Sequence, residues 1–338
     1  MVTIKEVAAR AGVSTATVSR VLNRRGRYTP DTEQRVLAAV KELGYAVNPT
    51  ARSLKTGTSA TMGILLPPAV LLDHPDILHT ALGYLFGRGY AVHILPDGEM
   101  EEGITGLGSG RFDGLLCMMT PVSQQALGGL LETGKGFVLM GVETERQDVN
   151  LVDIDYFQAG YTATAELIGL GHRDILFVSG LGDRYRGREL LRGYLLALDE
   201  NGIRYREELL VNREVPAATG GAALGHEAVR QRWEAGLSAV FAADDRIAAG
   251  ALRWAADNGL RVPGELSVVG VGDLPLSAYL HIPLTTVKLP FVQFGELGAE
   301  ILVNAVQRSD GLVTRVKLNS RLVPRTTWAR APGGRAAW

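Results

Sequence analysis

The chain has 338 residues, of which 46% are hydrophobic and 21% are charged. This composition indicates a folded protein of two or three domains and excludes wholesale disorder. The longest apolar runs, such as residues 62–72, are interrupted by Gly or Pro before the ~20 residues that a membrane-spanning helix needs. The first residues lack the pattern of an export signal. We therefore expect a cytoplasmic protein without a membrane partner.

Charge is distributed unevenly along the chain. Residues 1–58 contain ten Lys or Arg and four acids, whereas the rest of the chain contains 25 basic and 32 acidic residues. A small basic head on a mildly acidic body suggests that the head alone binds a polyanion. Charge by itself leaves open the alternative of a solvated basic surface.

The head shows the pattern of three short helices. Thr3 and Glu6 have the spacing of a capping box, so a first helix follows Thr3 and ends at Gly12. Ser14 is placed to cap a second helix after a very short turn. A third helix follows Pro30 and ends before Gly44. Two short helices joined so closely, with a third covering them, predict a helix-turn-helix unit.

The second helix is predicted to read DNA. Val18, Val21 and Leu22 face inward, which leaves the opposite side free to enter a major groove. Arg20 can pair with a guanine edge, and small side chains can meet a thymine methyl. The predicted base-reading residues are Thr15, Ala16, Thr17 and Arg20, and the predicted backbone contacts are Thr3, Ser14, Ser19, Asn23, Arg24 and Arg25.

The head resembles a known family. The run from residue 3 to 23, Thr-Ile-Lys-Glu-Val-Ala-Ala-Arg-Ala-Gly-Val-Ser-Thr-Ala-Thr-Val-Ser-Arg-Val-Leu-Asn, is similar to the DNA-binding signature of the lactose-repressor (LacI/GalR) family of bacterial transcription regulators. Residues 48–57 are similar to the hinge of that family. The resemblance implies a hinge that becomes helical on the operator and wedges a leucine into the minor groove. The corresponding residues are Ala51, Arg52, Leu54 and Lys55. Taken alone, this segment could equally be a linker with one exposed leucine.

The body alternates strands and helices. Strands are predicted at 62–66, 90–95, 112–118, 137–140, 175–178, 239–242 and 266–271, and helices at 76–87, 124–132, 158–170, 187–200, 245–258 and 291–306. Such alternation is typical of parallel sheets covered by helices. Cys117 lies in one of these apolar runs and is predicted to be a core side chain. The fold class is therefore a small all-α helix-turn-helix head plus an α/β body.

The family resemblance sharpens the domain organisation. It implies two doubly wound parallel-sheet subdomains, like those of a periplasmic binding protein, with a ligand in the cleft between them. We expect a DNA-binding domain at 1–46, a hinge at 47–59, an effector-binding and dimerisation domain at 60–328, and a frayed tail at 329–338. The two subdomains would comprise about 60–157 plus 289–319, and 158–288 plus 320–328.

Effector contacts are expected where strands end at the cleft. The resemblance implies Arg188, Asp244, Asp245 and Asp273. Asp244 and Asp245 could each be a helix N-cap instead, and Arg184 or Arg186 could take the place of Arg188. Gly272 stands where many relatives have an acid, which puts ordinary sugar binding through that position in doubt.

The sequence carries no motif of catalysis, metal binding or a cofactor. We therefore expect a regulator, most simply a repressor, which binds a palindromic operator in double-stranded DNA as a homodimer, with a tetramer possible. A sugar or sugar derivative in the cleft would modulate its affinity. In the alternative hypothesis, the body is a ligand-free platform for dimerisation or for docking another protein.

Overall fold

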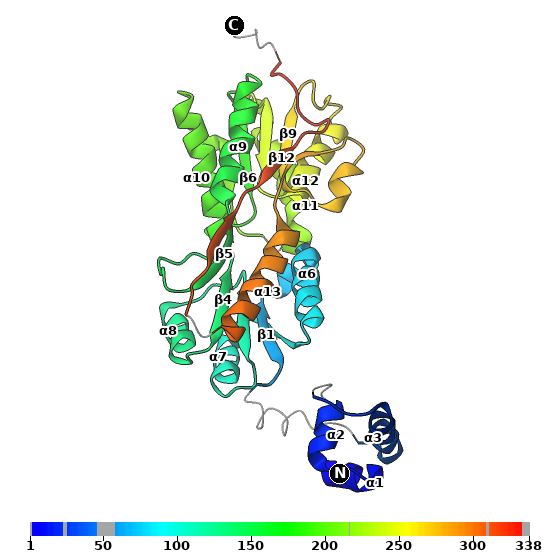
Figure 1. The fold of residues 1–338 in the computed structure, drawn as a ribbon. Helices are drawn as coiled ribbons and strands as arrows, with labels where there is room; N and C mark the ends of the chain where they lie inside the picture. Colours follow the sequence, from blue (N-terminus) through cyan, green and yellow to red (C-terminus); the bar gives the residue numbers. More distant parts are fainter. Residues whose placement is uncertain (1, 23–25, 46–57, 216, 309–310, 333–338) are drawn as a thin grey trace. The chain divides into compact units, whose positions relative to one another are not determined.

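The computed structural model describes residues 2–22, 26–45, 58–215, 217–308 and 311–332. These residues belong to two compact units, Met1–Ser59 and Ala60–Trp338. We call them the head and the body and describe each by itself (Figure 1).

Three helices form the head. They are α1 (Ile4–Ala11), α2 (Thr15–Leu22) and α3 (Pro30–Leu43). The predicted capping box is present, since the Glu6 backbone N–H donates to the Thr3 hydroxyl and the Glu6 carboxylate accepts from the Thr3 backbone N–H at 2.7 Å. Gly12 ends α1 with φ of 66°, a conformation that glycine adopts without steric cost.

The core of the head consists of small aliphatic side chains from all three helices. It contains Val7, Ala8, Ala11, Val18, Val21, Val36 and Ala39. A core of this size stabilises a domain only marginally. Helices α1 and α3 are also joined by an ion pair between Arg10 and Glu42 at 2.7 Å, which is exposed and therefore weak.

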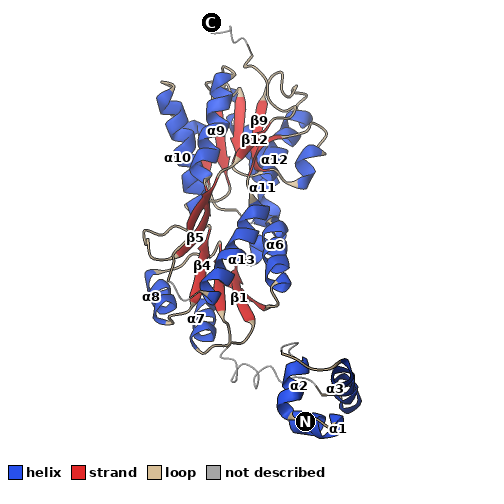
Figure 2. Cartoon of the chain, in the orientation of Figure 1, coloured by secondary structure: helices blue, strands red, loops and turns tan. Residues whose placement is uncertain are grey.

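Lobe 1 of the body comprises residues 60–154 and 291–318 around one parallel sheet (Figure 2). Its strands are β1 (Thr61–Leu66), β2 (Ala91–Pro96), β3 (Gly114–Met118), β4 (Gly136–Met140), β5 (Asn150–Ile154) and β11 (Arg315–Leu318), in the order β11-β5-β4-β3-β1-β2. Its helices are α5 (Pro68–Asp73), α6 (Pro75–Gly87), η1 (Asp97–Glu99), α7 (Met100–Gly108), α8 (Gln124–Glu132) and α13 (Phe291–Gln307).

Alternation along β1 shows how this sheet is covered on both faces. Met62 and Ile64 join the hydrophobic cluster that contains α6 and α13, whereas Leu65 joins the cluster that contains α7 and α8. A strand that is buried on both faces reads as a continuous apolar run, as β1 does. Cys117 on β3 is fully buried in the second cluster, as predicted.

Lobe 2 comprises residues 156–288 and 321–332 around a second sheet. Its strands are β6 (Ile175–Ser179), β7 (Leu210–Asn212), β8 (Ala239–Ala242), β9 (Ser267–Gly272), β10 (Thr285–Lys288) and β12 (Arg321–Val323), in the order β12-β10-β9-β8-β6-β7. All neighbours are parallel except β12, which is antiparallel to β10. Its helices are α9 (Tyr156–Gly169), α10 (Tyr185–Glu200), η2 (Glu207–Leu209), α11 (Ala217–Arg232), η3 (Trp233–Ala235), α12 (Asp245–Asp257) and η4 (Pro275–Ala278).

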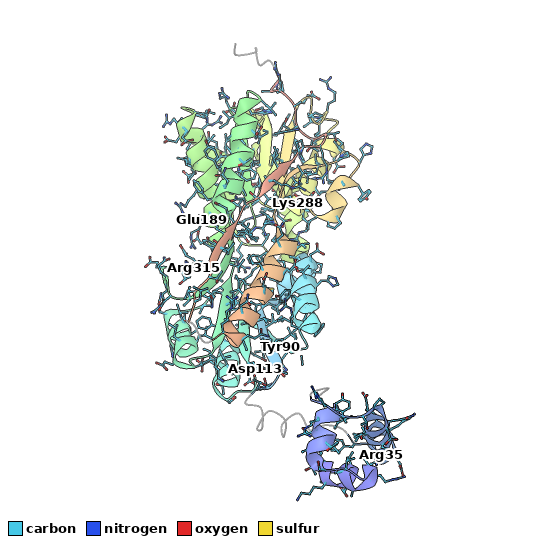
Figure 3. All side chains as sticks on the ribbon, viewed as in Figure 1. Arg35, Tyr90, Asp113, Glu189, Lys288 and Arg315 are labelled. Atoms are coloured by element: carbon cyan, nitrogen blue, oxygen red, sulfur yellow. The ribbon has the colours of Figure 1, made fainter. Side chains whose placement is uncertain are left out.

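The chain passes between the lobes three times. It crosses after β5, after β10 and between β11 and β12. Lys288, labelled in Figure 3, is the last residue of β10 and lies close to the boundary between the lobes. The division expected after residue 157 falls inside α9, because that helix begins at Tyr156 and packs on the lobe 2 side.

The structure adds elements that the periodicity did not reveal. Each predicted strand and helix of the body occurs within two residues of its expected bounds, whereas α5, α11 and several short strands were not predicted. Ala329 and Ala331, assigned to a frayed tail, instead hydrogen-bond to Ser267 and Leu170 of the body. None of the described helices is long and apolar enough to cross a membrane.

Candidate nucleic-acid interface and ligand cleft

Helix α2 has one buried face and one exposed polar face. Val18 and Val21 are buried against the other two helices of the head. Apart from Leu22, the residues that remain exposed or half-buried are Thr15, Ala16, Thr17, Ser19 and Arg20. A short helix anchored in this way can lie in a major groove with its first turns against base edges.

Two of the predicted phosphate contacts already cap helices. The Ser14 hydroxyl accepts from the Thr17 backbone N–H at 3.1 Å, and Thr3 is held by Glu6. Both residues are exposed, so their caps lie at the surface of the head. Among the described residues, Arg20 makes no ion pair, and its side chain passes beside Gly26, where an added Cβ would lie 3.5 Å from the Arg20 Cδ.

Seven residues predicted to contact DNA lie outside the described residues. They are Asn23, Arg24, Arg25, Ala51, Arg52, Leu54 and Lys55. Their roles stay predictions.

A cavity of about 860 Å³ lies where the two lobes and the crossing segments meet. Its size is that of a small-molecule site. Lobe 1 contributes His74 and Asp76, lobe 2 contributes Asp273 and Lys288, and the crossings contribute residues such as Asn319. Side chains of both charges therefore line it.

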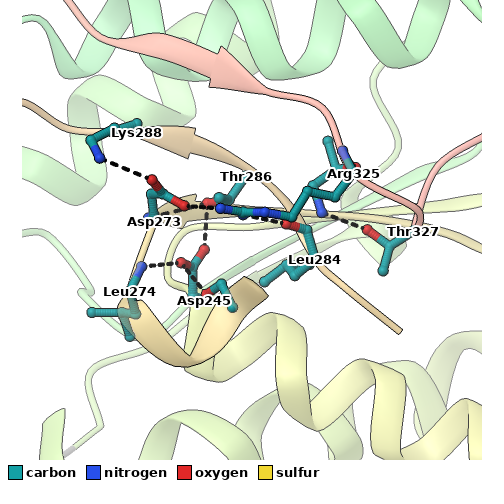
Figure 4. A network of polar contacts seen from close by, with 10 residues as sticks. Asp245, Asp273, Leu274, Leu284, Thr286, Lys288, Arg325 and Thr327 are labelled. Atoms are coloured by element: carbon teal, nitrogen blue, oxygen red, sulfur yellow. Dashed lines mark hydrogen bonds and ion pairs between the residues drawn. The ribbon is translucent and has the colours of Figure 1, made fainter. Parts of the chain in front are cut away.

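Asp245 is the centre of a closed network in lobe 2 (Figure 4). Its carboxylate accepts from the Thr286 hydroxyl at 2.5 Å, the Ser277 hydroxyl at 2.7 Å and the Leu274 backbone N–H at 2.8 Å. Burial raises the pKa of Asp245 in spite of these bonds. Gly270 leaves the room for it, because a Cβ there would lie 2.3 Å from the Asp245 Oδ1.

Asp273 belongs to the same region but is held by cations. Its carboxylate accepts from Arg325 at 2.5 Å and lies 3.2 Å from the Lys288 ammonium group. Burial raises the pKa of Asp273, but the hydrogen bonds from Arg325 and Lys288 outweigh it and hold that pKa below its usual value. The backbone turns sharply here, with φ of 134° at Gly272 and 58° at Asp273, so glycine at 272 fits a conformation that other residues rarely adopt.

Asp244 is the N-cap of α12. Its carboxylate accepts from the Arg246 backbone N–H at 2.9 Å and pairs with the Arg246 guanidinium at 2.9 Å. Asp244 thus takes the N-cap role that the sequence left open, whereas Asp245 is the first residue of α12 and holds the network above. Neither side chain is in the lining of the cavity, and their roles as effector contacts stay predictions.

The first turn of α10 bridges the two lobes. The Tyr185 hydroxyl donates to Asp153 of β5 at 2.6 Å. Arg188 forms an ion pair with Glu143 of lobe 1, and 43% of its side chain is exposed. Arg188 therefore bridges the two lobes at the surface, and its role as an effector contact stays a prediction.

Arg186 is the arginine of this turn that points inward. Only 8% of it is exposed. Its Nη2 donates to the Ala243 carbonyl at 3.1 Å, and its Nη1 lies 3.4 Å from the His74 Nε2. Burial, and after it the charge of Arg186, lower the pKa of His74 from 6.5 to about 3, so His74 is neutral and accepts this bond.

Sequence reasoning missed His74 and Tyr156. His74 lies between α5 and α6 and stacks on Phe291 with ring centres 4.2 Å apart. Tyr156 begins α9, directly after the first crossing, and is buried beneath Arg186. Tyr156 could have been found from the sequence, because it is a polar residue directly after a predicted crossing. His74 could not, because it is an isolated histidine in an apolar stretch.

The chain resembles known bacterial regulators over almost its whole length. Residues 3–48 match the family described as "Bacterial regulatory proteins, lacI family", and residues 164–328 match a periplasmic binding protein-like domain. The HTH-type transcriptional repressor PurR of Aliivibrio fischeri is 32% identical over 341 residues, which cover 95% of this chain and all of that protein. PurR of Yersinia enterocolitica is 32% identical over 98% of each chain.

Solved structures of regulators have the same architecture. The lac repressor dimer bound to operator and the anti-inducer ONPF superposes with a TM-score of 0.83 at 26% identity, covering 97% of this chain and 99% of that one. The transcriptional regulator CelR in complex with cellobiose gives a TM-score of 0.70 at 30% identity, covering 97% and 100%. This chain is therefore a DNA-binding transcriptional repressor whose body is a ligand-binding domain, and it is not an enzyme. It belongs to the lacI family of bacterial regulatory proteins.

Proposed function

We propose that the chain binds a palindromic operator as a homodimer and that a sugar or sugar derivative in the cleft changes its affinity for that operator. The observation that carries the DNA-binding part is α2, which is anchored by Val18 and Val21 and leaves Thr15, Ala16 and Arg20 exposed. An operator-binding protein acts where the chromosome is, so the expected cytoplasmic location forms part of this proposal.

Exposed apolar side chains of the body support a dimer. Phe86 and Ile94 of lobe 1 are 58% and 43% exposed, and Leu276 and Tyr279 of lobe 2 are 45% and 88% exposed. Contiguous exposed apolar surface is typical of an interface between subunits, and these side chains are candidates for it. Ile94 also lies on β2, which is an edge strand of its sheet. The unpaired backbone groups of an edge strand are prone to associate with another chain unless they are covered. A twofold-symmetric dimer would read two equal half-sites, hence a palindrome.

The cavity between the lobes supports an effector. Residues of both lobes line it, so a ligand bound there would favour one arrangement of the lobes over another. Among the similar structures, CelR was solved with cellobiose. A ligand-free platform, the alternative hypothesis, has no use for a cavity of about 860 Å³.

The DNA-binding proposal is tested by selecting sequences from random duplexes with the full chain and measuring their affinity by fluorescence anisotropy. We expect an inverted repeat and a complex of two chains per duplex, with the mass of the free protein determined by light scattering. Selection of a single, non-repeated site bound by one chain would contradict the dimer, and a tetramer would appear as four chains on two duplexes.

The effector proposal is tested by linkage. A ligand that changes operator affinity by some factor must have its own affinity changed by operator DNA by the same factor. Isothermal titration of the ligand with and without operator measures this directly. Equal ligand affinities in both titrations would show that the cleft does not control the head.

A further inference from the structure

The first turn of α10 in lobe 2 meets two carboxylates of lobe 1. Tyr185 and Arg188 lie three residues apart, so both side chains leave the helix on the same face. The Tyr185 hydroxyl donates to the Asp153 carboxylate at 2.6 Å. The Arg188 guanidinium pairs with Glu143. Asp153 lies near the end of β5 and Glu143 follows the neighbouring strand β4, so both bonds reach the same edge of the lobe 1 sheet.

The buried carboxylate of Asp153 relies on lobe 2 for a hydrogen bond from a side chain. Only 6% of Asp153 is exposed. Its Oδ1 accepts from the backbone N–H of Ile154 at 2.8 Å, and its Oδ2 accepts from Tyr185. Lys317, which is beside Asp153 in the sheet, pairs with Asp155 at 3.5 Å. Burial and, after it, the bond to Asp153 raise the pKa of Tyr185, so the phenol keeps the proton that it donates.

Arg188 is held in position for its ion pair. Its Nη1 donates to the Asp183 carbonyl in the loop before α10 at 2.5 Å, and its Nη2 donates to Glu143. Both side chains of the ion pair are exposed to solvent. Exposed ion pairs contribute little, so we expect this one to be weaker than the bond between Tyr185 and the buried Asp153.

The start of α10 lacks acidic groups of its own. Its N-cap, Arg184, makes no capping bond with its side chain, and its first turn contains no acid. Negative charge near the N-terminus of a helix is stabilising, because the unpaired N–H groups and the helix dipole are positive there. Asp153 and Glu143 supply that charge from lobe 1. The two lobes therefore complement each other in charge as well as in hydrogen bonding at this point.

We propose that the pairs Tyr185–Asp153 and Arg188–Glu143 form a latch that holds the two lobes together in the absence of a ligand. The chain crosses between the lobes three times, so contacts such as these decide how the lobes are arranged. Opening the lobes at the latch exchanges both bonds for bonds to water. The latch goes beyond the proposed function, because it concerns the body before any effector binds. It sets the population of one arrangement, and with it the apparent affinity of every ligand that prefers that arrangement.

Distances between the lobes test the latch directly. Spin labels are attached to Glu132→Cys on α8 and Ala256→Cys on α12, which are exposed positions of lobes 1 and 2, and pulsed electron paramagnetic resonance is recorded on the full chain. The natural Cys117 is fully buried and does not take a label. An excess of unlabelled chain ensures that each oligomer contains one labelled chain. The measurement needs neither operator nor effector, so its outcome is independent of the proposed function.

Two variants remove the two parts of the latch. Tyr185→Phe removes only the hydroxyl, and we expect the equilibrium between latched and unlatched lobes to shift roughly tenfold or more. Glu143→Gln should shift it by no more than about threefold. The double variant should show a second distance population that is larger than in either single variant. A distance distribution in the double variant that equals that of the wild type would overturn the latch.

Tyr161→Phe is the matched control. The Tyr161 hydroxyl donates to the Glu200 carboxylate at 2.7 Å, which is the same kind of bond, but both residues belong to lobe 2. This variant should leave the distances between the lobes unchanged. Thermal unfolding of each variant completes the test, because a merely structural bond changes stability alone. If Tyr185→Phe lowers the melting temperature without changing the distances in the double variant, or if Tyr161→Phe changes the distances equally, the latch is refuted.

Discussion

The head and the body present their functional side chains in opposite ways. In the head, Thr15, Ala16 and Arg20 are exposed on one short helix, and the structure of the head does not depend on them. In the body, several polar residues near the cleft are buried and hold the fold together, as Asp245 does. A site that reads a large external partner can be carried by one helix, whereas a site that encloses a small ligand shares its residues with the core.

The largest effect should follow from removing Asp245. In Asp245→Ala, the Leu274 N–H and the hydroxyls of Ser277 and Thr286 lose their acceptor, at about 1 to 3 kcal/mol for each buried group. We expect the body to lose about 3 kcal/mol or more. Urea unfolding followed by tryptophan fluorescence measures it selectively, because all four tryptophans lie in the body. A stable body that merely stopped responding to ligand would show that Asp245 is an effector contact after all.

Arg20→Ala should affect function without affecting stability. If Arg20 pairs with a guanine, the variant should bind the selected operator about 1 to 3 kcal/mol more weakly per half-site and discriminate less at that position. Tryptophan-monitored unfolding of the body should be unchanged. Anisotropy titrations on the operator and on random duplex distinguish the two kinds of contact, since equal losses on both would mean that Arg20 meets only phosphate.

Leu54→Ala tests the predicted hinge. If Leu54 wedges into the minor groove, only the DNA-bound state uses its side chain, so operator affinity should fall by roughly 1 kcal/mol or more and the DNA should bend less. Ligand binding to the body should stay the same. Gel mobility on circularly permuted operator fragments measures the bend, and an unaltered bend would leave the hinge as a tether.

Lowering the pH should change the contributions of Asp273 and Asp245 to stability in opposite directions. The pKa of Asp273 is below its usual 3.8, so the stability that it contributes is complete above that value and is lost as the pH falls through its folded pKa. The pKa of Asp245 is raised, so its contribution is present below 3.8 and is lost as the pH rises through its folded pKa. Between pH 7 and pH 3, Asp273→Asn should lose less stability than the wild type and Asp245→Asn more. The free energy of unfolding is measured by urea titration at each pH. If it changes equally with pH in the wild type and in both variants, neither carboxylate contributes to stability as described.

The smallest effect should come from Arg188. Its ion pair with Glu143 is exposed, and such pairs contribute only about 0 to 1 kcal/mol. Arg188→Gln should therefore change stability by less than that and leave the affinity of any cleft ligand within about threefold. A loss of ligand affinity much larger than threefold would support the effector contact that the sequence predicts for Arg188.

The sequence by itself determined the head and the repeating pattern of the body. Caps such as Thr3 and Ser14, and the helical spacing of Val18 and Val21, are local interactions, so each can be recognised within a few residues of the chain. The same holds for buried strands such as β1, whose continuous apolar run requires cover on both faces. The spacing of apolar residues within α2 is enough by itself to predict which face of this helix is exposed.

Only the tertiary structure decided which polar residues of the body are free. Asp245 and Arg188 look like ligand contacts along the chain, but each has a partner from another segment, Thr286 on β10 for Asp245 and Glu143 in lobe 1 for Arg188. Arg186 and Arg188 are two residues apart on one helix, and the turn of that helix sends one inward and the other to the surface. Whether a buried group has a partner depends on contacts between segments that are distant in sequence, and no local pattern records them.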